Sequence, residues 1–270
     1  MTEDADEADP SAAAAPLPDE QQATEQLARL FNVIDVWQAA AQQRGVLSAQ
    51  PGSPLAGDDQ AANPYHVSHA AVQEIVGALD HLHALRMLVQ TAKSLHTLAP
   101  FTLNRAAIEC GAIAVWLLAP KSRDERIRRR LVLATQNARD IDGALKVMGE
   151  ASSLSDDLDD IRRVARRRPS LDPNGIVGSP PGVERIIGEA GDAFEIGSEA
   201  AVTYWKACSG ITHNRLWASL NLLDMEELGH VANVGNYRMT ASFRNVLTAT
   251  TLSVSFSNEA RRLFALRSQR

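Results

Sequence analysis

Arg105 and Glu109 are the first side chains in this chain whose types and spacing point to a polar site. They are four residues apart within the strongly apolar segment 101–118, so they share one face of a helix. A buried charge needs an opposite charge or a hydrogen-bonding group nearby. Arg before Glu is the weaker order for an isolated helical pair, which predicts that groups from other helices also contact it. The pair is either a structural ion pair that fixes helix packing or part of a functional centre.

A second polar cluster lies in the segment YWKACSGITHNRLW, residues 204–217. Helical spacing places Lys206, Ser209 and His213 on one side. Ser209 and His213 have the types of a nucleophile and its base, but the sequence contains neither a GxSxG turn nor a glycine-rich oxyanion loop, so a serine hydrolase is not expected. His213 is then either a hydrogen-bonded core histidine or a general acid/base, because imidazole titrates near neutral pH.

Two arginine-rich segments, 121–130 and 161–168, have the charge that a polyanion requires. The candidates for phosphate contacts are Arg126, Arg129, Arg130, Arg163 and Arg167. No aromatic residue interleaves with either run, so the stacking platform typical of single-strand binding is missing. A solvated helix face is the alternative interpretation, since arginines near a helix end also complement the helix dipole.

The sequence predicts no cofactor and no metal. His66, His69, Asp80, His81 and His83 occur close together, but most of them share a face opposite the apolar stripe of their helix. A metal site inside a bundle would need inward carboxylates and ExxH pairs on facing helices, and the one ExxH, Glu227 to His230, lies outside the predicted helices. Walker, dinucleotide-binding and kinase motifs are also missing from the sequence.

The composition is that of a soluble globular protein, with 45% apolar and 22% charged residues among 270. Cys110 and Cys208 form no CxxC pair, which favours a reducing cytoplasm. The first 25 residues hold eight acids and no base, so residues 1–22 are predicted to be a disordered acidic tail, with no export signal. The wholly apolar run 110–120 is too short to span a membrane, and no membrane partner is expected.

The expected fold is all-α: one bundle of six to eight helices over residues 23–270. Hydrophobic periodicity and capping residues predict helices near 25–44, 64–98, 101–118, 123–150, 156–168, 199–223 and 240–267. Asn63 and Pro64 are expected to open the second helix, and Ser122 with Glu125 the fourth. Long loops are expected near 45–65 and 169–183. No convincing alternating strand is found, although 245–256 is β-branched enough to be either helix or strand.

Two segments taken together, RAAIECGAIAVWLLAP and YWKACSGITHNRLW, resemble a set of uncharacterised helical proteins common in actinobacteria, which have an R-x-x-x-E helix early and an S-x-x-x-H helix late. Such proteins are sometimes compared with HEPN domains, helical bundles that often act as metal-independent ribonucleases. The resemblance implies that Arg105, Glu109, Ser209 and His213 face one another in a polar pocket inside the bundle. One difference is that the nearest arginine follows His213 instead of preceding it in the helix.

Two functions therefore stay open. The favoured one is a non-catalytic binding or scaffold protein, with a homodimer among the assemblies considered, whose polar cluster fixes packing. The alternative is an RNA- or phosphate-directed ribonuclease, toxin or defence component. In that case His213 is the acid/base, Arg105 and Lys206 stabilise a phosphate, and the arginine runs guide the RNA.

Overall fold

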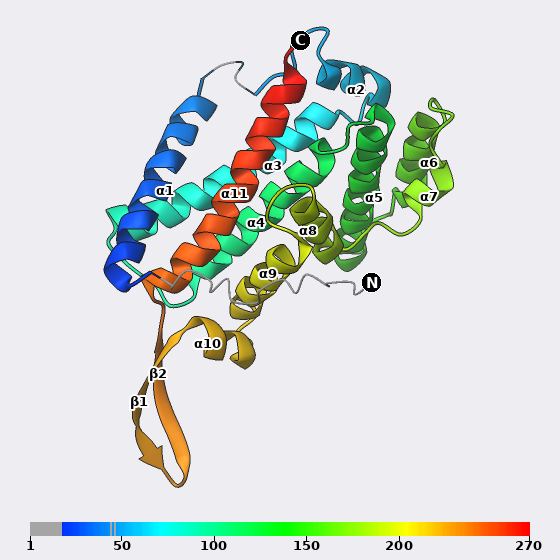
Figure 1. The fold of residues 1–270 in the computed structure, drawn as a ribbon. Helices are drawn as coiled ribbons and strands as arrows, with labels where there is room; N and C mark the ends of the chain where they lie inside the picture. The colour runs from blue at the N-terminus through cyan, green and yellow to red at the C-terminus, as the bar shows by residue number, and fades with distance from the viewer. Residues whose placement is uncertain (1–17, 44, 46) are drawn as a thin grey trace, which may run out of the picture.

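Helix α4 (Ala99–Leu118) lies at the centre of the molecule, which the computed structural model describes over residues 18–43, 45 and 47–270 (Figure 1). It packs against α3 (Val67–Arg86), α11 (Phe243–Ser268), α8 (Val183–Asp192) and α9 (Ser198–Thr212). The other described elements are α1 (Glu20–Ala41), α2 (Pro54–Ala62), the π-helix η1 (Met87–Thr91), α5 (Arg123–Met148), α6 (Leu154–Ala165), α7 (Pro173–Val177), α10 (Leu216–Leu222), β1 (Asp224–Val231) and β2 (Val234–Thr240).

The apolar character of α4 explains its central position. It is long and apolar enough to cross a membrane, yet 61% of its most apolar 18-residue window is buried inside the bundle, as expected of a core helix. Its side chains contribute to both hydrophobic clusters of the core. A Cβ at Gly111 would lie 2.9 Å from the Cβ of Phe256, so this glycine permits the close approach of α4 and α11.

The prediction of a mostly helical fold is confirmed, but the predicted count of six to eight helices is wrong. The described residues contain eleven α-helices and a small two-stranded sheet. The predicted loop 45–65 contains α2, which Ser53 caps through a 3.1 Å bond from the Ala56 N–H. Helix α7 lies inside the predicted loop 169–183, and α8 was not predicted. Short helices give too few periodic positions to stand out from a Gly- and Pro-rich background.

Several predicted helix boundaries also move. The Asn63–Pro64 peptide is cis, and α3 begins at Val67 after the N-cap His66, not at Pro64. Helix α1 begins at Glu20, where Asp19 and Gln22 form a capping box, so residues 20–22 belong to a helix and not to the tail. The rest of the predicted tail, up to residue 17, lies outside the described residues.

Other boundaries are confirmed. Ser122 caps α5 by accepting a 3.4 Å hydrogen bond from the Glu125 N–H. The ambiguous segment 245–256 is helical and lies within α11, whose N-cap is Ser242. Helix propensity of the β-branched residues in α11 is weak, so its helical state depends on the packing of its buried face against α4.

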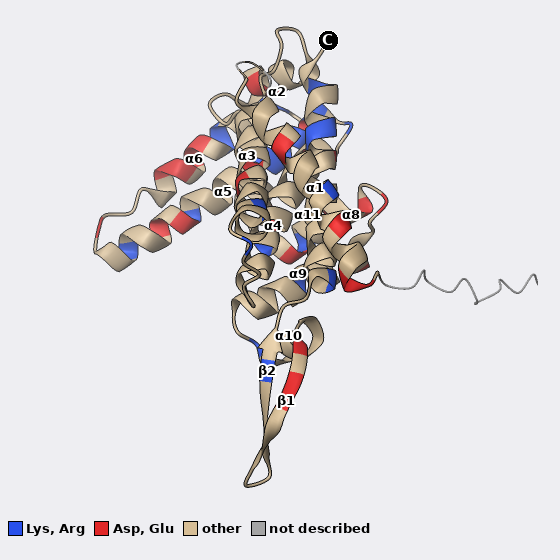
Figure 2. Cartoon of the chain, turned by 90° about the vertical axis from the view of Figure 1, so that its left-hand side faces the viewer, with Lys and Arg blue, Asp and Glu red and all other residues tan. Residues whose placement is uncertain are grey.

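The β-hairpin is the main element that the sequence did not reveal. Strands β1 and β2 pair antiparallel, with a bulge between Glu227 and Gly229. The hairpin extends away from the helices in two perpendicular views (Figures 1 and 2). Nearly all of its residues are exposed, so there is no buried face to produce the alternating pattern by which strands are recognised.

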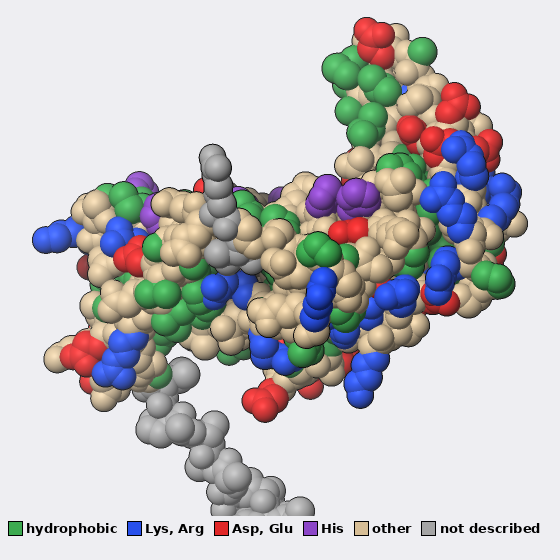
Figure 3. All heavy atoms as spheres, turned by 90° about the horizontal axis from the view of Figure 1, so that it is seen from above, with side chains coloured by type: hydrophobic (Ala, Val, Ile, Leu, Met, Phe, Trp, Pro, Cys, Tyr) green, Lys and Arg blue, Asp and Glu red, His purple; other side chains and the backbone are tan. Residues whose placement is uncertain are grey.

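Helices α5 and α6 form a second projection, the α5–α6 limb, which extends to one side of the bundle (Figure 2). Seen from above, its outer end stands away from the other helices and carries both apolar and charged side chains (Figure 3). A cavity lies where the α5–α6 limb faces α3. This arrangement determines which polar groups line that cavity.

Candidate functional site

The predicted pair of Arg105 and Glu109 is present on α4. The Arg105 Nη2 lies 2.7 Å from the Glu109 Oε1, and both side chains are half-buried. The indole Nε1 of Trp205, on α9, donates a 2.7 Å hydrogen bond to the same carboxylate oxygen. The prediction that another helix supplies a partner is therefore confirmed. The Arg105 Nε is buried and has no hydrogen-bond partner within the part of the chain that the structure describes.

Lys206 and His213 do not join this pair. Lys206 is exposed, and its Nζ lies 2.6 Å from Glu184 Oε1 on α8. His213 is exposed because α9 ends at Thr212 and the chain turns at Asn214, which has a φ of +51°. Ser209 is half-buried, and its carbonyl oxygen accepts a 3.0 Å bond from the His213 N–H. The expectation of one buried centre that contains Arg105, Glu109, Ser209 and His213 is wrong.

The break between α9 and α10 has a local cause. The predicted helix 199–223 is two helices, and the second folds back so that Ala218 and Trp217 lie against Gly210. A Cβ at Gly210 would lie 2.9 Å from the Trp217 ring. The glycine therefore gives α10 a place to pack, and the turn before α10 takes His213 out of the helical register assumed for it.

Glu74 and Cys110 extend the polar cluster toward α3, and neither was predicted. Burial raises the pKa of Glu74; a hydrogen bond from Cys110 lowers it, and the nearby charge of Glu109 raises it further. Burial and the Glu74 charge raise the pKa of Cys110 to about 12. Glu74 lies three residues after Ala71 and four before Ala78, both fully buried. An acid between two small buried residues was the sequence signal that it faces inward.

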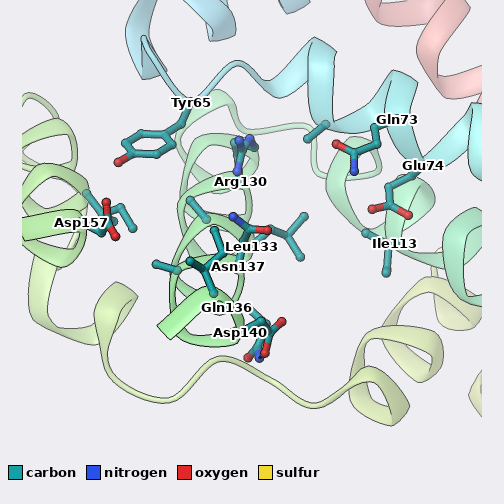
Figure 4. Close-up of a pocket in the computed structure, with 15 residues that line it drawn as sticks. Tyr65, Gln73, Glu74, Ile113, Arg130, Leu133, Gln136, Asn137, Asp140 and Asp157 are labelled. Carbon is teal, nitrogen blue, oxygen red and sulfur yellow. Dashed lines mark hydrogen bonds between the residues drawn. The ribbon is translucent and has the colours of Figure 1, made fainter. Parts of the chain in front are cut away.

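A cavity of about 450 Å³ lies between α3, α4, α5 and α6 (Figure 4). Gln73 and Glu74 enter it from α3, and Arg130, Asn137 and other residues line it from α5. The Arg130 Nε donates a 3.0 Å hydrogen bond to the His66 carbonyl. Burial lowers the pKa of Arg130. The cavity was not predicted because its walls come from helices that are distant in the sequence.

The five arginines expected to contact a polyanion have different positions. Arg126 is 2% exposed, and its Nε and Nη2 donate to the Asp58 carboxylate at 2.6 and 2.9 Å. The prediction that Arg126 contacts a polyanion is therefore wrong: its charge is neutralised inside the protein. Arg129 is mostly buried as well, with its Nε 2.8 Å from Glu125 and its guanidinium 4.7 Å from the centre of the Trp116 ring.

The other arginines of that set lie nearer to solvent. Arg163 is exposed and pairs with Asp160. Arg167 is exposed and donates a 2.7 Å hydrogen bond to the Asn63 carbonyl. Arg130 lines the cavity instead of the surface of the limb. The two arginine runs therefore do not form one continuous solvated face, since their members bind acids and carbonyl groups of several elements.

The described residues contain no group of three or more His, Cys, Asp and Glu side chains arranged to hold a metal ion. Of the histidines weighed as ligands, the rings of His66 and His69 contact each other edge to face, with centroids 4.5 Å apart. Comparison with known protein families, curated proteins and solved structures finds no match for this chain. The resemblance to the actinobacterial helical proteins and to HEPN domains stays a prediction.

Glu74 gives the protein a predictable pH dependence. Its folded pKa is raised above the ordinary value of 4.5, so the folded state holds this proton more tightly than the unfolded chain. At pH values below 4.5 the Glu74 carboxyl is protonated in both the folded and the unfolded state, so it costs the folded state nothing. Stability is lost as pH rises from the pKa of the unfolded chain through the higher pKa of the folded state. The groups that face Glu74 from α4 are Cys110 and Glu109.

We expect Glu74→Gln to be more stable than the wild type at neutral pH and equally stable in acid, because the amide cannot ionise. Urea unfolding at a series of pH values measures this difference. Asp156→Asn, at an exposed position, serves as the control and should show no such pH-dependent gain. If the difference in unfolding free energy between Glu74→Gln and the wild type were the same at every pH, the expected pH dependence would be contradicted.

Proposed function

We propose that this protein is a non-catalytic binding protein that assembles as a homodimer through the β1–β2 hairpin. The hairpin carries the observation that supports this function: it leaves the bundle and exposes large apolar side chains. Val231 and Val234 at its tip are 68% and 63% exposed, and Met225, Leu228 and Tyr237 are about half exposed. Contiguous exposed apolar residues are typical of interaction surfaces.

The hairpin also lacks the contacts that stabilise strands. An isolated two-stranded hairpin is marginally stable in water, and each of its outer edges presents unpaired backbone groups. The described sheet contains only β1 and β2, so both strands have such an edge. Pairing with another strand would satisfy the backbone groups of one edge and cover part of the apolar surface.

Charge favours β2 as the strand that pairs with its copy. Strand β1 carries Asp224, Glu226 and Glu227, so pairing two β1 strands would bring like charges together. Strand β2 carries one charge, Arg238. In a two-fold antiparallel pairing centred on Tyr237, each Arg238 lies opposite Asn236 of the second copy. Such an arrangement is self-complementary, as a two-fold interface requires.

The assembly is tested by measuring molar mass with light scattering coupled to size exclusion. We expect the wild type to approach twice the 29.2 kDa of one chain, and Tyr237→Asp to elute as a monomer with unchanged helical content. The matched control is Val147→Asp, which introduces the same charge at the exposed end of α5 and should leave the dimer intact. A wild type that is monomeric at all concentrations up to the high micromolar range would refute the proposal.

The RNA-directed alternative has no comparable observation in its favour. Arg126 and Arg129 are engaged inside the protein, and His213 is exposed at the end of α9, outside a buried centre. Cleavage of cellular RNA by the purified wild type, abolished in His213→Ala, would favour that alternative over a non-catalytic function.

A further inference from the structure

The cavity between α3, α4, α5 and α6 contains an arginine whose charge is not neutralised by direct contact. The Arg130 Nε is occupied by the His66 carbonyl, and the guanidinium carbon lies 5.7 Å from the centre of the Tyr65 ring. Within the described residues, no carboxylate lies within 4.0 Å of Arg130, and its two terminal nitrogens have no hydrogen-bond partner. These nitrogens are therefore free to bind an anionic group in a bidentate manner.

Glu74 supplies a negative group at another part of the same cavity. Figure 4 shows Glu74 and Gln73 projecting from α3 toward α5, apart from Arg130 and Tyr65. The Glu74 carboxylate is mostly buried and has no cation within 4.0 Å among the described residues. Burial also raises its pKa. A cationic group of a ligand would neutralise this carboxylate, as the protein itself does not.

The spacing of these two groups sets the length of the ligand. Arg130 is bonded to the carbonyl of His66, and Glu74 lies eight residues further along α3, a rise of about 12 Å. The Glu74 side chain leans back toward the helix N-terminus, which shortens the gap between the charged groups to roughly 10 Å. Ile113 and Leu133 line the same cavity and offer apolar surface for a hydrocarbon chain.

The remaining acids exclude a polyanion. Asp140 and Asp157 line the cavity together with Glu74, so three acids accompany one arginine. A ligand with several negative charges, such as a polyphosphate, would be repelled by these acids. A ligand with one negative and one positive end is complementary to a cavity lined by one arginine and several acids.

We propose that this cavity binds an elongated zwitterion, with a carboxylate on the terminal nitrogens of Arg130 and an ammonium group on Glu74. A hydrogen bond of about 2.8 Å at each end takes up more than half of the roughly 10 Å separation, so about three or four bonds join the two charged groups of the ligand. Ligands of this class are ω-amino acids and diamino acids. This inference does not depend on the hairpin or on the assembly proposed above.

Isothermal titration calorimetry of the full chain with γ-aminobutyrate and L-2,4-diaminobutyrate tests the proposal. Butyrate lacks the ammonium group and propylamine lacks the carboxylate, so each probes one end of the cavity. We expect the wild type to bind γ-aminobutyrate at least about tenfold more tightly than either singly charged compound, as two charge-assisted contacts predict.

Two variants test which residue binds each charged group of the ligand. Glu74→Gln should bind γ-aminobutyrate no better than butyrate, and Arg130→Gln should bind it no better than propylamine. Arg130→Lys, which retains the charge, replaces Arg130→Gln if the latter unfolds, and should lose only part of the affinity. Asp156→Asn, on α6 outside the cavity lining, is the control and should bind as the wild type does.

The result that overturns the proposal is a wild type with no saturable heat for either zwitterion, or one that binds γ-aminobutyrate and butyrate equally. Wild-type affinity in both Glu74→Gln and Arg130→Gln would overturn it as well. Molar mass measured on the same samples separates this outcome from a failure of the hairpin-mediated dimer, since none of these substitutions lies in β1 or β2.

Discussion

Replacing Asp58 with asparagine is expected to lower the free energy of unfolding by about 3–5 kcal/mol, the cost of removing one partner from a buried ion pair. Asp58 is fully buried, and its carboxylate accepts hydrogen bonds from Arg126 at 2.6 and 2.9 Å and from Arg123 at 3.0 Å. The amide offers Arg126 one neutral oxygen in place of two carboxylate oxygens, so the guanidinium charge is left with only neutral partners, among them the carbonyls of Pro120 and Lys121. Urea unfolding followed by far-UV circular dichroism measures the loss.

Two further variants isolate the cause. Asp58→Asn combined with Arg126→Met should recover part of the lost stability, because the guanidinium that lost its negative partner is then no longer buried in the interior. Asp140→Asn, at an exposed position, should change the unfolding free energy by less than about 0.5 kcal/mol. If Asp58→Asn alone lost less than about 1 kcal/mol, the ion pair would not be a main contributor to stability.

The ion pair of Asp58 and Arg126 also shows why the arginine runs were misinterpreted. Local sequence suggests a solvated face, since acids and bases alternate along the run 121–130. The acid that binds Arg126 is 68 residues away, in a segment predicted to be a loop. Hydrophobic periodicity reports which face of a helix is apolar, but it does not report which distant side chain will meet a charge on that helix.

The central helix was predictable for the opposite reason. Segment 101–118 is apolar almost all round, which requires neighbours on nearly every side, and Arg105 and Glu109 share a face by spacing alone. Both inferences use residues within one turn or two of each other. The same local reasoning failed for His213, because it assumed that one helix continued where α9 and α10 fold against each other at Gly210.

The cavity marks the limit of sequence reasoning about function here. Arg130 was identified for its charge, but as a surface residue, and Glu74 was not identified at all. Their common environment comes from the packing of α3 against α4 and of α5 against α6, which no short-range pattern specifies. Buried charges at such junctions are costly unless they are paired with an opposite charge, so the terminal nitrogens of Arg130 and the Glu74 carboxylate are better indicators of a ligand than the arginine count.

Trp116→Ala is expected to cost about 3–5 kcal/mol of unfolding free energy, as truncation of a large core side chain does. Trp116 is 1% exposed, its indole Nε1 donates a 2.7 Å bond to Glu189 Oε2, and Arg129 stacks on its ring. Trp116→Phe keeps a ring but loses the hydrogen bond, so it should cost about 1–2 kcal/mol. Trp217→Ala removes the same side chain from a half-exposed site and should cost less than half as much as Trp116→Ala. Equal losses at the two tryptophans would show that the contact of α4 with α8 does not depend on the buried indole.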